Sequence, residues 1–160
     1  MQVKKYFVFL ILLCCSSNFS NENTQISVIE ADVVLTEILE SYKNFSESPQ
    51  NAVDTIWDNA HPSNREITGP KDRFERMLLS EPYNSILDLK EYSFTKTVES
   101  EDSQHYEIKI LAKNNSYFEV TWVFQLDVCL DDSENKCWLT VAVTAPSYFC
   151  LLYTSPSPRD

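Results

Sequence analysis

The sequence predicts an α+β domain in which helices come first and an antiparallel sheet follows. Two observations carry this prediction. Up to residue 78, apolar residues recur every three or four positions, which is the period of an amphipathic helix. From Tyr92 onward they recur at every second position, the period of a strand with one buried face. Because the two patterns occupy separate parts of the chain, we expect N-terminal helices packed on one face of a curved meander sheet.

The first two helices are expected over residues 27–45 and 49–60. The apolar stripe of the first consists of Val28, Ala31, Leu35, Ile38, Tyr42 and Phe45. Ser48 can cap the second, with Pro49 at the first helical position, where a missing N–H costs nothing. The buried stripe of the second consists of Ala52, Val53, Ile56, Trp57 and Ala60.

A polar connection is expected over residues 62–70, because the residue before a proline avoids helical geometry and His61-Pro62 therefore ends the second helix. A third, short helix then begins at Pro70 and stops before Glu81-Pro82. Its inward side chains would be Phe74, Met77 and Leu78.

Four strands make up the C-terminal part. They begin near Tyr92, Tyr106, Phe118 and Cys137, and polar turns at 99–103, 113–116 and 131–136 separate them. Cys129 and Cys137 flank the last turn, so a hairpin would bring them face to face. We expect a Cys129–Cys137 disulfide, with a pair of free or buried thiols as the alternative.

Neither end of the chain is expected to belong to the folded domain. Residues 1–17 have the pattern of a signal peptide: Lys4 and Lys5, then an apolar run, then Ser16 and Ser17. The alternative is an uncleaved anchor, although the run is shorter than the roughly 20 residues of a membrane span. Residues 150–160 resemble a translated adapter sequence, and their Ser-Pro repeats also fit a disordered tail. A single domain over residues 18–149 remains, destined for secretion or the lumen of the secretory pathway.

Composition excludes several functional classes. Gly69 is the only glycine, so neither a phosphate-binding P-loop nor a dinucleotide fingerprint is present, since each needs several glycines. A Gly-x-Ser-x-Gly nucleophile elbow is absent for the same reason. The net charge of −11 argues against nucleic acid and against anionic membranes after signal cleavage. The sequons at Asn44 and Asn114 are expected glycosylation sites, and a third sequon, at Asn18, sits at the presumed cleavage site.

Short motifs add a resemblance to a family. They are Trp57-Asp58-Asn59-Ala60-His61-Pro62, then Thr68-Gly69-Pro70 with Phe74, Met77 and Tyr83, and finally Trp138-Leu139-Thr140-Val141. Over residues 30–144 the chain resembles a family of uncharacterised proteins with a nuclear transport factor 2-like fold, a cone of helices against a bent sheet. It departs from that family in lacking glycines in the strand turns and in carrying the cysteine pair. The resemblance implies a fold and no defined chemistry.

Enzymes of the broader superfamily hold an acid or base inside the cone, and four residues here have suitable side chains: Asp58, His61, Tyr83 and His105. Asp58 and His61, three residues apart at a helix end, are close enough to hydrogen bond, so Asp58 would orient His61 as a base. The alternative is that both face solvent, and His105 is expected to be exposed. Two distant histidines and an oxidised cysteine pair do not supply a zinc site, and no cofactor is expected.

Aromatic residues are the remaining indication of function. Trp57, Tyr106, Phe118, Trp122 and Phe124 would line the interior of the cone if it stays open, or form an ordinary core. We therefore expect a non-enzymatic binding module for a small hydrophobic ligand or a protein partner. The alternative is a small lyase- or isomerase-like enzyme that uses His61 or Asp58. A homodimer built sheet to sheet is a further possibility.

Overall fold

The computed structural model describes residues 28–149, and the chain there is α+β, as predicted. Its helices are α1 (Ala31–Lys43), α2 (Pro49–Asp58), α3 (Pro62–Thr68) and α4 (Lys71–Leu78), followed by the 3₁₀ helix η1 (Tyr83–Ile86). Its strands are β1 (Glu91–Glu99), β2 (Ser103–Leu111), β3 (Tyr117–Val128), β4 (Lys136–Val143) and β5 (Ser147–Tyr148). The expected signal peptide at 1–17 and the expected tail at 150–160 lie outside the described residues.

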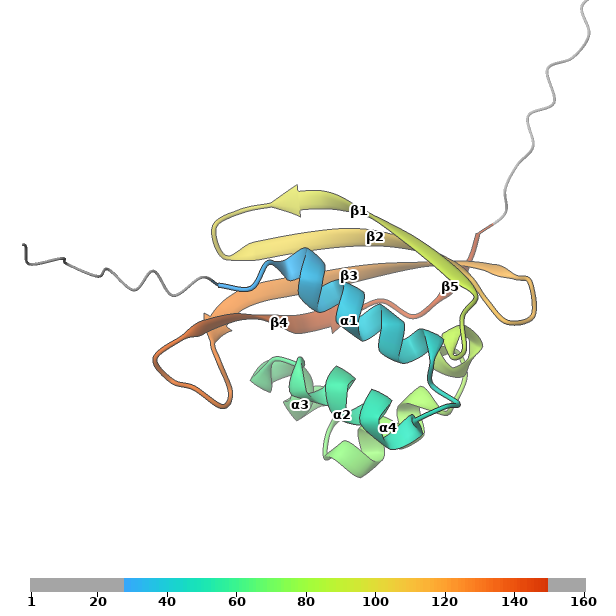
Figure 1. Ribbon diagram of the computed structural model, residues 1–160, viewed down its shortest axis with the longest axis horizontal. Coiled ribbons are helices and arrows are strands. Elements are labelled where there is room, and N and C mark those ends of the chain that lie inside the picture. The colour runs from blue at the N-terminus through green and yellow to red at the C-terminus, as the bar shows by residue number, and fades with distance from the viewer. Residues whose placement is uncertain (1–27, 150–160) are drawn as a thin grey trace, which may run out of the picture.

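The strands form one open antiparallel sheet, and the helices cover one of its faces (Figure 1). The strand order is β1-β2-β3-β4, and β5 pairs with β3 at Phe118 and Glu119. The short strand β5 was not expected from the sequence, because two residues are too few to show a period. The long strand β3 pairs with β2 from Tyr117 to Gln125 and with β4 from Trp122 to Val128. It is therefore the strand around which the sheet is organised.

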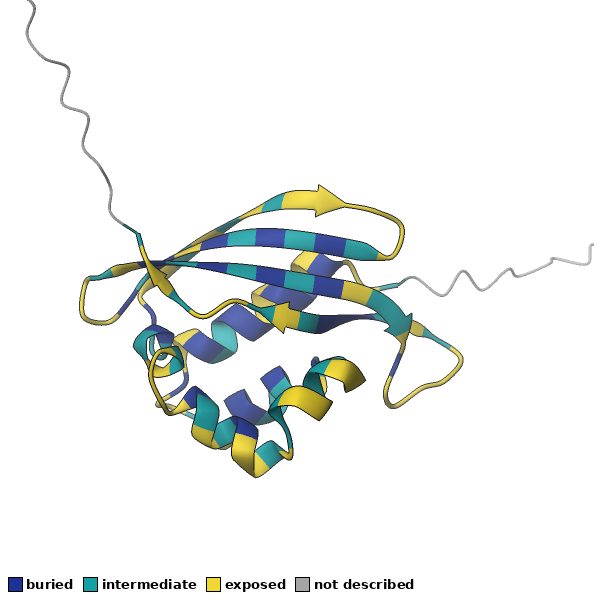
Figure 2. Cartoon of the chain, turned by 180° about the vertical axis from the view of Figure 1, so that it is seen from behind, coloured by how far each residue is buried: buried dark blue, intermediate teal, exposed yellow. Residues whose placement is uncertain are grey.

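The core lies between the helices and the inner face of the sheet. Buried and less buried residues alternate along β2 and β3, as the period of two requires (Figure 2). The helical contribution is the predicted stripe of α1 together with the inward residues of α2 and α4. The buried residues of α1 are Ala31, Val34, Leu35, Ile38, Leu39 and Tyr42. Helix packing of this kind stabilises α1 far more than its own propensity does.

Polar contacts fix α1 to the first two strands. The hydroxyl of Tyr106, a residue with no exposed surface, donates to the carboxylate of Asp32, and Lys96 Nζ lies 3.2 Å from the same carboxylate. Near the C-terminal end of α1, Glu40 Oε1 accepts a hydrogen bond of 2.9 Å from the hydroxyl of Tyr92 on β1. The hydrogen bond from Tyr106 is the main reason that the pKa of Asp32 lies below its ordinary value, with Lys96 acting in the same direction.

The prediction of a connection over residues 62–70 was wrong, because Pro62–Thr68 form the helix α3. Pro62 occupies the first helical turn, where it is well tolerated, and the side chain of His61 accepts the N–H of Ser63 as a cap. None of the seven residues of α3 is buried. A helix without a buried stripe has no apolar period, which is why the sequence pattern did not reveal it.

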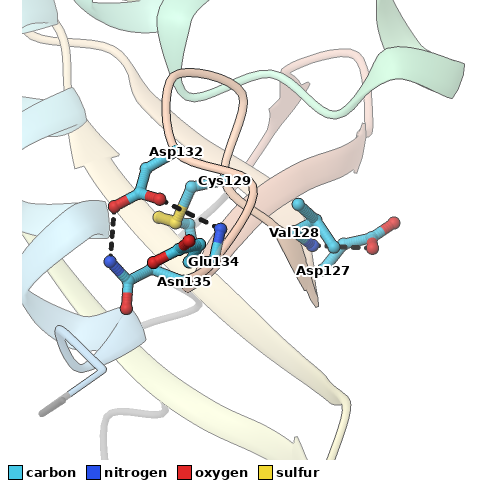
Figure 3. Close-up of a disulfide and its surroundings, with 7 residues drawn as sticks. Asp127, Val128, Cys129, Asp132, Glu134 and Asn135 are labelled. Atoms are coloured by element: carbon cyan, nitrogen blue, oxygen red, sulfur yellow. Dashed lines mark hydrogen bonds between the residues drawn. A yellow bond between two sulfur atoms is a disulfide. The ribbon is translucent and has the colours of Figure 1, made fainter.

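The predicted Cys129–Cys137 disulfide is confirmed, with the two Cα atoms 5.0 Å apart. It closes the hairpin between β3 and β4, where Cys129 also donates its N–H to the carbonyl of Asn135 over 2.9 Å. The carboxylate of Asp132 accepts hydrogen bonds from the N–H of Glu134 and the side-chain amide of Asn135 (Figure 3). The polar tip is therefore held by both a covalent bond and local hydrogen bonds.

Candidate functional site

A cavity of about 70 Å³ lies between the helices and the sheet. We call it the helix–sheet cavity. Every helix and η1 contribute to it, and β3 and β4 close it on the other side. Its lining residues are Tyr42, Ile56, Ala60, Asn64, Thr68, Phe74, Met77, Leu78, Tyr83, Ile86, Trp122, Thr140 and Val143. An apolar hollow with a few polar groups pointing into it is the usual form of a small-molecule site.

Tyr42 is the most informative of these residues. It projects from the buried stripe of α1, is 3% exposed and meets Trp122 edge to face, with the ring centroids 6.2 Å apart. Its hydroxyl has no hydrogen-bond partner among residues 28–149, but its oxygen is not fully enclosed, because the only enclosed side-chain atoms without a partner in that range are Arg65 Nε and Asn135 Oδ1. Burial raises the pKa of Tyr42, and the nearby Tyr83 adds to the effect. The hydroxyl is therefore neutral and offers a hydrogen-bond donor to the cavity.

Two more polar groups of the lining have unused capacity. Thr140 Oγ1 accepts the indole N–H of Trp122 over 2.9 Å, which leaves the hydroxyl hydrogen of Thr140 without an acceptor among the described residues. Asn64 donates its side-chain amide to the carbonyl of Thr140 over 3.1 Å, and its Oδ1 has no donor in the same part of the chain. An occupant could thus receive hydrogen bonds from Tyr42 and Thr140 and donate one to Asn64.

The aromatic residues expected to line the interior divide between cavity and core. Trp122 lines the cavity, whereas Tyr106, Phe118 and Phe124 are buried elsewhere in the core. Trp57 is half-buried beside the cavity: its ring packs on Phe74, with centroids 5.3 Å apart, and carries the guanidinium of Arg65 at 5.0 Å. Tyr83, expected as a possible acid or base, does line the cavity.

His61 pairs with a carboxylate other than the expected one. Its Nε2 lies 2.9 Å from Oδ2 of Asp127 on β3, and its Nδ1 lies 2.7 Å from Oγ of Ser63. Nδ1 also accepts the backbone N–H of Ser63 over 3.1 Å, so the hydrogen of the neutral ring is on Nε2 and is donated to Asp127. This bond is the largest cause that lowers the pKa of Asp127.

The expected hydrogen bond between Asp58 and His61 is therefore not formed. Helix α2 ends at Asp58, and Ala60 pairs with Thr140, so Asp58 and His61 do not follow each other on a helix. Asp58 is instead 71% exposed and lies 3.8 Å from the guanidinium of Arg65. His105 is half-buried on β2, where alternation places it on the face away from the helices.

Ser63, His61 and Asp127 have the residue types of a hydrolytic triad, but the arrangement serves as a helix cap. A triad needs a nucleophile beside free N–H groups that can stabilise an oxyanion. Here the N–H of Ser63 is bound to His61 Nδ1, and those of Asn64 and Arg65 are bound to the carbonyl of His61. Neither His61 nor Asp58 belongs to the lining of the cavity.

The sequence matches no protein-family model and no curated protein. Among residues 28–149, no group of three or more His, Cys, Asp or Glu side chains gathers in a way that would hold a metal ion. No helix in that range has the length and apolar character needed to cross a membrane. The site therefore has to be interpreted from its own geometry.

Proposed function

We propose that this protein is a secretory-pathway binding module without catalytic activity, and that it holds a small hydrophobic ligand in the helix–sheet cavity. The observation that carries the proposal is the unpartnered hydroxyl of Tyr42. An occupant that accepts its hydrogen would gain a hydrogen bond worth about 1 kcal/mol net. The apolar remainder of the lining would contact the rest of the ligand.

The proposal extends to the architecture. Helices packed over one face of an antiparallel sheet, with the cavity between them, would correspond to a nuclear transport factor 2-like cone and its interior. The motifs around Trp57 and Gly69 support this assignment, since they lie in and between the helices that wall the cavity. On this proposal the cavity is the interior of the cone.

The volume of the cavity limits the ligand. Small-molecule sites commonly measure about 300–1,000 Å³, whereas this cavity measures about 70 Å³. We therefore expect a ligand no larger than one aromatic ring, or a larger one admitted when a side chain moves. Met77 is suited to such a movement, because its unbranched side chain repacks easily.

An acid–base enzyme is less well supported. Such an enzyme needs its acid or base within hydrogen-bond reach of the bound substrate. The two residues expected for that role, His61 and Asp58, contact Asp127 and Arg65 and do not line the cavity. The binding proposal requires no group outside the lining.

Native mass spectrometry of the protein purified from a secretory host tests whether a ligand is retained. We expect an additional mass on the folded protein that is lost on denaturation. The same spectrum reports a homodimer, if one forms. An unliganded mass, together with no change in melting temperature on addition of phenol at millimolar concentration, would contradict the proposal.

Phenol also serves as a probe for the role of Tyr42, since it combines one ring with one oxygen. Tyr42→Phe should weaken phenol binding by about fivefold, because a net hydrogen bond is worth about 1 kcal/mol. Tyr92→Phe is the matched control: it removes a hydroxyl that binds Glu40 outside the cavity, and it should leave phenol affinity unchanged. If the two substitutions change phenol affinity equally, phenol does not bind through the Tyr42 hydroxyl in the cavity.

A further inference from the structure

A second hollow, of about 350 Å³, lies between the start of α1 and the disulfide-closed hairpin of β3 and β4. We call it the hairpin groove. Both elements lie at the same end of the molecule (Figure 1). The groove is lined by Ile29, Val33, Val34, Glu37, Asn59, Cys129, Asp131, Asp132, Asn135, Lys136, Cys137 and Trp138. It shares no residue with the helix–sheet cavity, so it is independent of the proposed function.

The groove has an apolar floor that solvent reaches. Ile29 is 64% exposed and Val33 is 56% exposed, although both are aliphatic. Ile29 precedes the extended N-cap residue Glu30, Val33 lies in the first turn of α1, and both line the groove. Beside them, Val34 and Trp138 are buried and complete an apolar surface. A contiguous apolar patch with a polar rim is typical of a protein-binding surface.

The wall of the groove is rigid before any partner arrives. The disulfide and the hydrogen bonds of Asp132 fix the hairpin tip (Figure 3). The side-chain amide of Asn135 donates to Asp132, which ties two residues of the tip together. Rigid walls reduce the entropy lost on binding.

The charge around the floor is negative. Glu37, Asp131 and Asp132 line the groove and are opposed only by Lys136 among its lining residues. The whole chain carries a net charge of −11, which would attract a cationic partner from a distance and repel an anionic one.

We propose that the hairpin groove docks a basic segment of a partner protein. The segment inserts one apolar side chain between Ile29, Val33 and Trp138. Its lysine or arginine side chains lie against Glu37 and Asp131.

The probe is a fluorescein-labelled peptide, Gly-Lys-Leu-Arg-Phe-Lys-Gly, titrated with the full secreted protein in a fluorescence anisotropy assay. Val33→Asp should weaken binding at least about tenfold, the effect of losing a central contact. Ile67→Asp is the matched control, because Ile67 is 75% exposed on α3 and lies outside the groove. Both substitutions add the same negative charge, so simple charge attraction would strengthen binding in both.

A second pair of variants tests the charges. The double variant Glu37→Gln/Asp131→Asn should weaken peptide binding more than the double variant Glu66→Gln/Glu101→Gln. The second variant removes the same charge outside the groove. Urea unfolding midpoints of all variants establish that each one is folded. The proposal is overturned by equal losses within either pair, or by a peptide that does not bind. It is also overturned if sedimentation shows a dimer that Val33→Asp dissociates, since the occupant would then be a second copy of the chain.

Discussion

Gly69 shows how closely the end of α3 approaches Trp57 of α2. Its backbone is extended, with φ at −76°, so no unusual conformation demands glycine there. Glycine is required because there is no room for a side chain. A Cβ atom would overlap the carbonyl oxygen of Arg65 and lie 3.0 Å from Cη2 of Trp57. The single glycine of the chain therefore lets α3 end against the Trp57 ring.

Gly69→Ala should destabilise the protein by about 1–3 kcal/mol, the usual cost of overpacking. The carbonyl of Arg65 is backbone and cannot move aside as a flexible side chain would. Urea unfolding followed by tryptophan fluorescence measures the change. Glu66→Ala, an exposed substitution on the same helix, should stay within about 0.5 kcal/mol of the wild type. A stable Gly69→Ala protein would show that the junction is looser than described.

Asp32 should make stability depend on pH in the acid range. Its pKa in the folded state is lowered, chiefly by the hydrogen bond from Tyr106. The unfolded state therefore binds more protons than the folded state between the lowered value and the ordinary carboxyl pKa of about 4. The contribution of Asp32 is complete above that ordinary value and is lost as the pH falls through the folded one.

The test compares urea unfolding of the wild type and of Asp32→Asn from pH 6 down to pH 3. The wild type should be the more stable protein at pH 6, and the difference should shrink as the pH falls. Adding Tyr106→Phe to both proteins should also reduce the difference in their free energies of unfolding at pH 6, because it removes the main cause of the lowered pKa of Asp32. A difference that stays constant with pH would rule out the titration of Asp32 as the cause.

At the scale of elements, the disulfide hairpin is the part whose stability can be isolated. The bond closes a loop with a sequence separation of 8, and loop-closure entropy for so short a loop is worth about 2–3 kcal/mol. Replacing both cysteines, Cys129→Ser with Cys137→Ser, should lower the free energy of unfolding by that amount. Hydrogen exchange should accelerate around residues 128–138 before it does in β2. Ser133→Ala at the same exposed tip should change neither quantity.

The strong periodic elements could be predicted from the sequence, and the site could not. The stripes of α1 and α2 and the strand alternation gave the order of elements, because burial imposes those periods. The cysteine pair was predictable because the two residues flank one turn. The site depends on contacts between distant residues: Asp127 is 66 positions from His61, and Tyr42 meets Trp122 across the core. No local pattern records such pairs.

At the scale of the whole molecule, the two predicted glycosylation sites gather at one end. Asn44 and Asn114 are both exposed, and Ser46 of the first sequon and Asn114 of the second line one hollow. Asp88 joins the two segments by accepting from the N–H of Ser46 over 2.7 Å and from Lys113 Nζ over 3.1 Å. The hairpin groove begins at Ile29, before α1, whereas Asn44 follows the last residue of that helix. Glycans on these residues would therefore leave the hairpin groove uncovered.

The full chain expressed in a eukaryotic secretory host should lose residues 1–17 and carry glycans at Asn44 and Asn114. Intact mass before and after treatment with an N-glycosidase measures both changes. Asn44→Gln and Asn114→Gln should each remove one glycan, and Asn51→Gln, outside any sequon, should remove none. A protein retained in cells with its first residues intact would contradict the signal-peptide prediction.

The absence of buried side chains from α3 has a consequence for kinetics. Asn64 and Thr68 of this helix line the helix–sheet cavity, yet α3 is attached to its surroundings by polar contacts such as His61 with Asp127 and Asn64 with Thr140. Detaching it exposes little apolar surface, so it should open far more often than the molecule unfolds. The residence time of a ligand would then be set by the rate at which α3 detaches. A ligand that stabilises the attached position of α3 would dissociate slowly.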